Sequence, residues 1–362
     1  MTLRFIIGGV ACVAALTSGL AQTEEPGTPN PSAGPYASSL NDPTNPYDAP
    51  IAGFVGPDGI GKARIQSGVD IDGNPTYINT NNYVNPIFKG WATTVVNYSP
   101  APGVASAWTN ANKALGAVTG DNFHVTTLGD LFSPTNAPAT GTNPPFGGSG
   151  SPYTGNPADL NDGFGFIGFD NPGSITLGFQ LPITNGAGAD FAVFENAFTS
   201  NYTTPGGSIV GEVFAELAYV EVSTDGVHFA RFPSESLTEG AVGQYGTVDP
   251  SNIYNLAGKS ANAYGESWGT PFDLDDLVDH ELVLNGSVDL LNINYIRLVD
   301  IPGNGTYLDS LGNPIYDAWV TFGSGGFDLD AIGAINVVPE PSTVALCGLG
   351  LGGLLLLYRR RA

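Results

Sequence analysis

Two aspartates near the C-terminal end of the chain have a spacing that suits a metal site. Asp328 and Asp330 alternate with Phe327 and Leu329. Because successive side chains of a β-strand point to opposite faces, both carboxylates should share one face while the apolar pair enters the core. Carboxylate oxygens are hard ligands of the kind that calcium binds. The alternative is that both carboxylates accept backbone hydrogen bonds at the start of a strand, and the residue pattern does not separate the two.

Further oxygen ligands stand at the ends of two other apolar segments. Glu195 and Asn196 end one predicted strand, and Asp300 ends another. Neighbouring buried carboxylates without a cation would repel each other or become protonated. The sequence therefore predicts a calcium site with five candidate ligands, Glu195, Asn196, Asp300, Asp328 and Asp330.

Acidic residues could instead form the carboxyl pair of a glycoside hydrolase. The two groups of such a pair lie about 5–10 Å apart beside a sugar, and one of them has a raised pKa. The obvious candidates are Glu195, Glu212, Glu216 and Glu221. Since the chain has 34 acidic residues, chance supplies several such pairs. A hydrolase is therefore the less favoured interpretation.

Other catalytic patterns lack the context that their chemistry needs. The G-x-S-x-G pattern at residues 265–269 would require an apolar strand before Ser267 and a helix after it, but Asn262 precedes it and Pro271 follows. The G-x-G-x-x-G pattern at residues 163–168 is not followed by a predicted helix. No two of the three histidines have the spacing of metal ligands. A non-enzymatic protein is expected.

The segment between the two apolar ends, residues 22–338, is strongly acidic. It contains seven basic and 33 acidic residues, a net charge near −26, and no cysteine. Such a surface repels phosphate backbones, so nucleic acid is not an expected partner, whereas divalent cations and neutral or basic glycans are compatible with it. Without disulfides the fold must be held by its core, and a chain of this length can bury one.

Short apolar runs that alternate with polar residues predict an all-β protein. Residues 22–85 are rich in Pro, Gly and Asn and are expected to form a flexible, poorly structured leader. Residues 86–337 should form an antiparallel jelly-roll β-sandwich with short helices at 104–115 and 273–279 and a long loop at 133–162. The predicted strands cover residues 92–98, 123–128, 174–181, 190–195, 217–223, 228–232, 295–300, 315–322 and 327–337.

The N-terminal end has the pattern of an export signal. Arg4 is followed by an apolar stretch from Phe5 to Leu16 and by the small residues Gly19 and Ala21. A positive start, an apolar centre and a small-residue cleavage site are typical of a secretory signal peptide. The sequence predicts that residues 1–21 are removed on export.

The C-terminal end, residues 338–362, combines a short motif with an apolar run. The run, residues 344–358, contains no charge and is followed by three arginines. As a helix it would span about 22 Å, which is short of a hydrocarbon core of about 30 Å, and the arginines should stay on the cytoplasmic side. A membrane-spanning helix is predicted. The motif and the arginines are Pro339, Glu340, Pro341, Arg359, Arg360 and Arg361.

In order and position these residues resemble the PEP-CTERM sorting signal of Gram-negative bacteria that make extracellular polysaccharide. The resemblance implies that a membrane-embedded exosortase recognises and processes the tail, and that the membrane anchor is transient. It also implies that the protein is delivered to the cell surface or the extracellular matrix. An ordinary C-terminal anchor is the alternative.

The strand-rich part carries a second resemblance, to bacterial cell-surface proteins that often have this sorting tail. Its later segments are also similar to the galactose-binding-like sandwiches of discoidin and carbohydrate-binding modules. The segments that carry these resemblances are residues 114–116, 173–177, 190–198, 220–226, 272–274, 296–300 and 326–332.

We therefore expect an exported, surface-directed, non-enzymatic protein that contributes to, or binds, the extracellular polysaccharide layer. The alternatives are a lectin-like module with one defined glycan, a purely structural matrix component, and a glycan hydrolase. Exposed aromatic rings could stack on sugars, and Trp268 and Trp319 are the candidates for this role.

Overall fold

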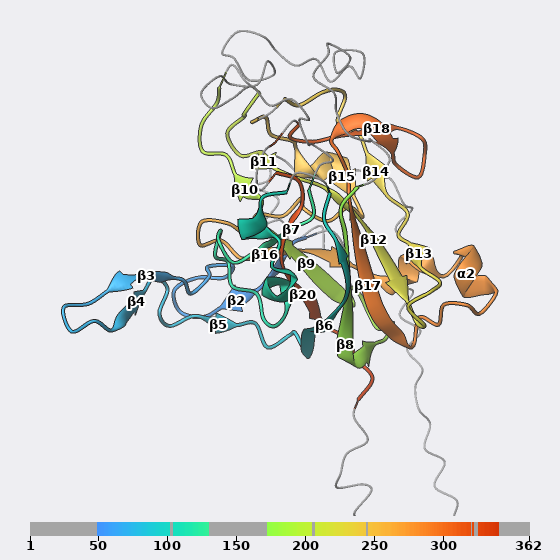
Figure 1. Ribbon diagram of the computed structural model, residues 1–362, viewed down its shortest axis with the longest axis horizontal. Helices are drawn as coiled ribbons and strands as arrows, with labels where there is room; N and C mark the ends of the chain where they lie inside the picture. The colour runs from blue at the N-terminus through green and yellow to red at the C-terminus, as the bar shows by residue number, and fades with distance from the viewer. Residues whose placement is uncertain are drawn as a thin grey trace, which may run out of the picture.

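The computed structural model describes residues 49–339, except residues 102–103, 130–171, 205–206, 244, 320 and 322–324. Its largest element is an antiparallel sheet of ten strands, which curls around an apolar interior (Figure 1). Along the sheet the order is β1, β16, β9, β20, β6, β8, β17, β12 and β13, and β7 also pairs with β20. The strands are β1 (Ile51–Ala52), β6 (Gly90–Ser99), β7 (Thr126–Thr127), β8 (Ser174–Ile183), β9 (Phe191–Glu195), β12 (Ala218–Ser223), β13 (Ala230–Arg231), β16 (Trp268–Phe272), β17 (Ile293–Asp300) and β20 (Asp328–Ala334).

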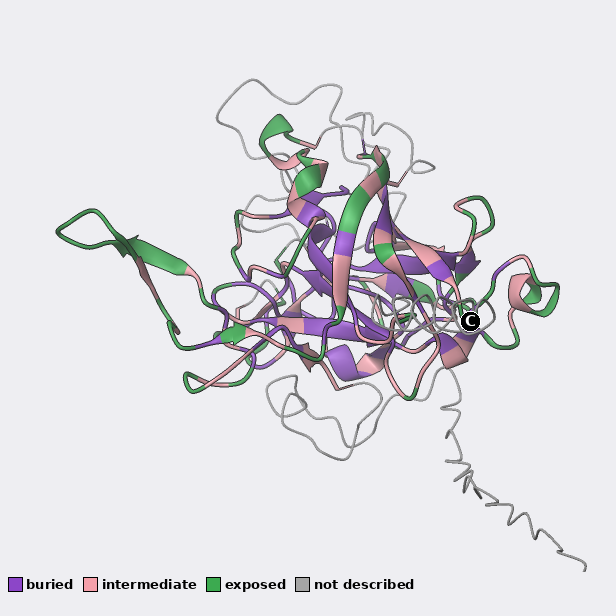
Figure 2. Cartoon of the chain, turned by 90° about the horizontal axis from the view of Figure 1, so that it is seen from below, coloured by how far each residue is buried: buried purple, intermediate pink, exposed green. Residues whose placement is uncertain are grey.

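The inner face of this sheet holds the main core. Val222, Ile296 and Leu177 lie opposite one another on β12, β17 and β8 and are fully buried. Such rows form because every second residue of these strands is apolar, and packed cross-strand pairs stabilise a sheet. Figure 2 shows the buried central strands. The predicted all-β, antiparallel class is confirmed, while the jelly-roll arrangement stays a prediction.

Residues 51–85, predicted to be part of a flexible leader, are instead folded onto the outer face of the sheet. β1 extends the sheet by pairing with β16, and Phe54 and Ala63 are buried against Phe194 and Ala331. The expectation was wrong because β9 and β20 provide an apolar outer face. Isolated apolar residues of this segment, such as Phe54 and Ala63, pack on that face even though Gly and Asn surround them in the sequence. This region also contains β2 (Phe54–Val55), β3 (Gln66–Val69), β4 (Pro75–Tyr77) and β5 (Tyr83–Val84).

The β3–β4 hairpin projects from the body of the molecule (Figures 1 and 2). Its tip is the turn around Asp70, whose carboxylate accepts the backbone N–H groups of Asp72 and Asn74 at 2.9 and 2.8 Å. Ile71 at this tip is fully exposed. The turn thus has the Asx geometry that favours tight hairpins.

A third apolar cluster lies outside β12, where Leu217 and Tyr219 pack with Val213, Ile301 and Ile315. Short paired strands surround it. They are β10 (Phe198–Thr199), β11 (Val213–Phe214), β14 (Glu235–Ser236), β15 (Ile253–Tyr254), β18 (Asn304–Leu308) and β19 (Pro314–Tyr316).

The predicted helix at 104–115 is two single turns of 3-10 helix, η1 (Ser106–Trp108) and η2 (Ala111–Ala114). Asn110 interrupts the helical pattern because its side chain accepts the Asn112 N–H and starts a new turn. In the 273–279 segment, η5 (Leu274–Leu277) is capped by Asp273 and is followed by α2 (Glu281–Leu284). A further turn, η4 (Pro250–Asn252), precedes β15.

Two predicted strands are much shorter in the structure. The 123–128 segment contains only β7, and among the described residues of the 315–322 segment only the last two residues of β19 (Pro314–Tyr316) are in a strand. Among the helices of the described ranges, none has the length and apolar character to cross a membrane. The predicted signal peptide, the 133–162 loop, the apolar run 344–358 and the terminal arginines lie outside the described residues.

The buried Asp190 connects segments that are far apart in sequence, and the half-buried Asp273 caps η5 close to it. Asp190 accepts the backbone N–H groups of Gly186 and Leu274 and the side-chain amide of Asn336, each at 2.8 Å. Burial raises the pKa of Asp190 to about 6. Burial likewise raises the pKa of Asp273 to about 7, with neighbouring carboxylates contributing.

Lowering the pH from 8 to 5 should therefore stabilise the protein. In the folded state Asp190 and Asp273 bind protons more tightly than in the unfolded chain, so stability is gained as the pH falls through about 7 and 6. We expect the melting temperature to rise by about 3–6 °C, measured by calorimetry. Asp273→Asn keeps a capping oxygen but does not titrate, so this variant should gain less between pH 8 and 6. Equal profiles for the variant and the parent would contradict the prediction.

Candidate functional site

Two exposed and three half-buried aromatic rings form a surface feature of the molecule, and the first group comes from the η1 and η2 turns and the segment that follows them. The rings of Trp108 and Phe123 are stacked, with centroids 6.2 Å apart and planes 23° apart. The Lys113 ammonium lies 5.5 Å from the centroid of the Trp108 ring and donates to the Phe123 carbonyl at 2.6 Å. This lysine holds both rings in place from the turn between them.

The second group comes from the β10–β11 pair and the loop before β16. Phe198 and Phe214 lie directly opposite each other on the two strands and stack at 4.9 Å, with planes 12° apart. The edge of Tyr264 meets Phe198 at 5.3 Å and 84°. Such offset and edge-to-face contacts are the preferred arrangements of aromatic pairs.

Asn122 joins the two groups into one surface. Its side-chain oxygen accepts the Tyr264 backbone N–H at 2.7 Å, and its carbonyl accepts the Asn196 side-chain amide at 3.4 Å. Phe123 is its neighbour in sequence, so the two groups of rings adjoin. We call the five rings of Trp108, Phe123, Phe198, Phe214 and Tyr264 the aromatic strip.

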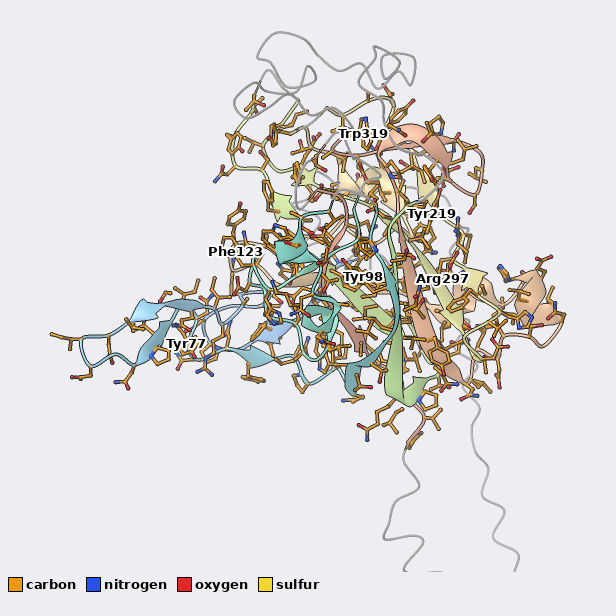
Figure 3. All side chains as sticks on the ribbon, in the orientation of Figure 1. Tyr77, Tyr98, Phe123, Tyr219, Arg297 and Trp319 are labelled. Carbon is orange, nitrogen blue, oxygen red and sulfur yellow. The ribbon has the colours of Figure 1, made fainter. Side chains whose placement is uncertain are left out.

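The outer rings of the strip face solvent. Phe123 is 73% exposed and Tyr264 is 71% exposed, and Figure 3 shows Phe123 on the flank of the molecule. Tyr264 has a φ of 56°, a left-handed conformation that costs a non-glycine residue about 1 kcal/mol or more. An exposed aromatic ring that is kept on strained backbone, as at Tyr264, is typical of an interaction surface.

The side chains on this surface are of the kinds that can contact a sugar. The flat faces of aromatic rings pack against the C–H face of a pyranose, and nearby amide and ammonium groups bind its hydroxyls. Asn122, Asn196 and Lys113 supply such groups at the edge of the rings. An electrically neutral ligand suits the site, because the chain as a whole carries a large negative charge.

Asp330, a predicted calcium ligand, is occupied by protein donors. Its carboxylate accepts the backbone N–H of Thr119 at 3.0 Å, that of Gly120 at 2.9 Å, the Thr119 hydroxyl at 2.9 Å and the Asn262 amide at 2.9 Å. Burial raises its pKa even though these bonds act to lower it. The alternative interpretation of the sequence, a carboxylate that binds backbone amides, describes Asp330.

Asp328 and Glu195 are neighbours, as the calcium prediction requires, but their partners differ from those of Asp330. The Thr127 hydroxyl donates to Asp328, and the Asp328 N–H donates to Glu195 Oε1 at 3.4 Å. Glu195 is 2% exposed, and its other carboxyl oxygen has no hydrogen-bond partner in the described part of the chain. Burial, and then the charge of Asp328, raise the pKa of Glu195 well above its usual range.

The other two predicted ligands lie apart from a common centre. Asp300 accepts the Phe327 N–H at 2.7 Å, while the side chain of Asn196 turns towards Asn122 and the aromatic strip. Over the residues that the structure covers, no three His, Cys, Asp or Glu side chains form a group with the arrangement of a metal site. Calcium therefore stays a prediction, with Glu195 and Asp328 as its best-placed ligands.

The glutamates considered for hydrolysis have other partners. Glu212 accepts the Thr247 hydroxyl at 2.7 Å, and Glu216 accepts the Gly326 N–H at 2.7 Å. Glu221 is bound between the guanidinium groups of two arginines, Arg231 on β13 and Arg297 on β17. Glu195 has the raised pKa of a general acid, yet at 2% exposure it offers no surface to a polysaccharide.

The structure corrects one of the two tryptophans predicted to stack on sugars. Trp319 is 2% exposed, so its ring is buried and cannot stack on a sugar. Trp268 is half-buried, its ring packs against Gly61, and its N–H donates to Glu266 at 3.2 Å. Ser267, in the G-x-S-x-G pattern, is fully buried in the loop that leads into β16.

The aromatic strip was not predicted from the sequence. Its five rings come from five separate segments between residues 108 and 264, so no linear spacing marks them. Each ring also fits an ordinary strand or turn. The only available signal was the high aromatic content of the chain, and it does not say which rings are exposed.

One comparison with known protein families identifies a segment of the chain. Residues 337–361 match the PEP-CTERM protein-sorting motif, which confirms the predicted resemblance of the tail. The motif indicates an exported, surface-directed protein that is processed by exosortase. No curated protein was found to match the chain in sequence.

Proposed function

We propose that this exosortase-sorted surface protein binds neutral polysaccharide of the extracellular layer through its aromatic strip, without cleaving it. The observation that carries the proposal is the aromatic strip, in which Phe123 and Tyr264 are more than two-thirds exposed and are connected through Asn122, while the other three rings are half-buried. The sorting motif supports it by directing the chain to the cell surface.

The charge of the protein narrows the class of glycan. Residues 22–338 carry about 26 more negative than positive charges, and long-range repulsion lowers the association rate of a like-charged polymer. A polymer of neutral sugars, for example a glucan or a galactan, presents the C–H faces and hydroxyls that rings and amides bind. Uronate-rich polymers should bind more weakly, with an affinity that rises as salt is added.

The test of this function is retention on a panel of immobilised polysaccharides, with new reducing ends measured in the same samples. The full chain in detergent is passed over neutral, acidic and basic polymers. Retention on a neutral polymer without cleavage is the expected result. Release of reducing ends would show a hydrolase, and a lack of retention on every polymer would favour a purely structural matrix component.

A calcium ion beside Glu195 and Asp328 is a separate proposal that concerns stability. The buried oxygen of Glu195 that has no hydrogen-bond partner among the described residues supports it, because a divalent cation would compensate two adjacent carboxylates. Excess chelator should then lower the melting temperature, and added calcium should restore it. An unchanged melting temperature would rule out a stabilising ion.

A further inference from the structure

The sorting motif begins at residues that are hydrogen-bonded to the end of β8. The matched segment starts at Val337, which forms a bridge to Ile183 at the end of β8. The Val338 N–H donates to the Pro182 carbonyl at 2.9 Å, and the Asn336 carbonyl accepts the Thr184 N–H at 3.1 Å. Backbone hydrogen bonds therefore hold the chain up to the residue before Pro339.

A short stretch of chain connects this point to the predicted membrane span. From Val338 to Val344 there are six residue steps, and an extended chain covers at most about 3.6 Å per step. When the apolar run is in the membrane, the end of the sheet that holds Val338 must lie within about 22 Å of its surface. That distance is shorter than the width of a folded domain.

The surface around this point is built from three loops and from residues 336–338 at the start of the tail, and we call it the tail-side end. The segment 182–185 is hydrogen-bonded to residues 336–338, where the sorting tail begins. The Asn185 N–H donates to the Leu290 carbonyl at 2.9 Å. Asp289 next to it accepts from and donates to Thr224 in the β12–β13 turn. In Figure 1 the ends of β8 and β17 meet at this lower end of the molecule. The tail-side end comprises residues 182–185, 224–228, 289–292 and 336–338.

Apolar side chains stand out from this end among acidic groups. Leu291 is 62% exposed and Val227 is 75% exposed. Asp225 and Asp289 lie in the same loops, and Asp225 is bonded to His228 at 2.8 Å. The two carboxylates would be repelled by lipid phosphate groups. Exposed apolar side chains together with acidic ones fit a protein surface better than a lipid surface.

We infer that the tail-side end is a docking surface for the extracytoplasmic face of the membrane-embedded enzyme that processes the tail. The enzyme must bind Pro339 to Pro341, and the residue immediately before Pro339 is held to the folded domain by a backbone hydrogen bond. The enzyme would thus contact the tail-side end and the linear motif at the same time. This inference rests on the sorting role stated above and on the predicted membrane span.

Site-specific photo-crosslinking in the producing cells tests the inference. A benzophenone side chain is placed at Leu291 or Val227, and for comparison at Ile71, which is fully exposed at the tip of the β3–β4 hairpin. We expect at least a five-fold higher yield of the adduct with exosortase from Leu291 and Val227 than from Ile71. The adduct should be absent in cells that lack exosortase. Equal yields from all three positions, or no adduct from Leu291 and Val227, would overturn the inference.

A second variant changes the tether instead of the surface. Ten Gly and Ser residues inserted between Val338 and Pro339 let the domain move away from the membrane, which lowers the effective concentration of the two surfaces. The Leu291 adduct should then fall several-fold, and an unchanged yield would contradict the inference.

Loss of the tail is followed by mass in the same cells, so that the two ideas can fail separately. If the parent chain is not processed, the sorting role itself fails. If it is processed without adducts from Leu291 and Val227, only the docking surface fails.

Discussion

Replacing Phe123 and Tyr264 together by alanine should weaken retention on a neutral polysaccharide by about 100-fold or more. Truncation of a well-placed aromatic contact residue typically costs about 2 kcal/mol of binding free energy, and 1.4 kcal/mol corresponds to a factor of ten. The two rings belong to different groups of the strip, so their effects should add to within about 0.5 kcal/mol. The measurement is the dissociation constant for a soluble fragment of the retained polymer.

Folding should be little affected by this pair of substitutions. Both side chains are more than 70% exposed, so the substitutions mainly remove the ring contacts with Trp108 and Phe198, each worth about 0.5–1.5 kcal/mol. A domain with a stability of about 5–15 kcal/mol stays folded after that loss. Tyr83→Ala on β5 is the matched control, because Tyr83 is also exposed, at 57%, but lies outside the strip. Undiminished binding by the double variant, or an equal loss in the control, would show that the glycan binds elsewhere.

Replacing Asp330 by alanine should destabilise the fold by about 3–5 kcal/mol. The substitution leaves two backbone N–H groups, a hydroxyl and a side-chain amide without their acceptor in a buried place, and each such group costs about 1–3 kcal/mol. Relief of the buried charge offsets part of the sum. For a domain with a stability of about 5–15 kcal/mol, this is a large fraction.

Urea unfolding gives the measurement, with the midpoint lower and the slope unchanged. Asp330→Asn keeps one acceptor oxygen and should lose about half as much stability as the alanine variant. Asp72→Ala, at the exposed tip of the β3–β4 hairpin, should change stability by less than about 0.5 kcal/mol. If the loss in Asp330→Ala disappears in excess chelator, Asp330 acts as a cation ligand and its role as a hydrogen-bond acceptor is contradicted.

Asp330 and the aromatic strip are connected through residues 119–123. Asp330 fastens the loop of Thr119 and Gly120 to β20, and the chain then continues through Asn122 and Phe123 into the aromatic strip. The carboxylate is therefore a support for the surface that we propose binds glycan. Milder variants such as Asp330→Asn should for this reason weaken glycan binding before they unfold the protein.

Much of the fold could be predicted because its cause is local. Alternation of apolar and polar residues located β8, β9, β12, β17 and β20, and the structure buries the expected side chains, such as Leu177, Ile296 and Leu329. The helix predicted at 104–115 failed because Asn110 competes locally for backbone groups. The prediction of a flexible leader was wrong from Ile51 onwards. The apolar residues of this segment are buried on the outer face of β9 and β20, which are far away in sequence.

The positions of the predicted calcium ligands depended much less on local sequence pattern. Asp328 and Asp330 are two residues apart, yet one bonds to Thr127 and the other to the 119–120 loop and Asn262. The pairing of β20 with β9 shifts register between Leu329 and Ala331, so simple alternation does not describe where these carboxylates go. A spacing rule cannot include such an irregularity.

The sequence by itself determined the sorting signal and the all-β fold class. A sorting motif is recognised as a linear segment, so Pro339 to Arg361 can be identified before any fold is known, and the period of a strand is a property of neighbouring residues. Only the tertiary structure decided which aromatic rings form a surface, which carboxylates are satisfied, and how close the sorting motif lies to the sheet. These features join segments up to about two hundred residues apart, and contacts over such separations are made by folding and are not written in local spacing.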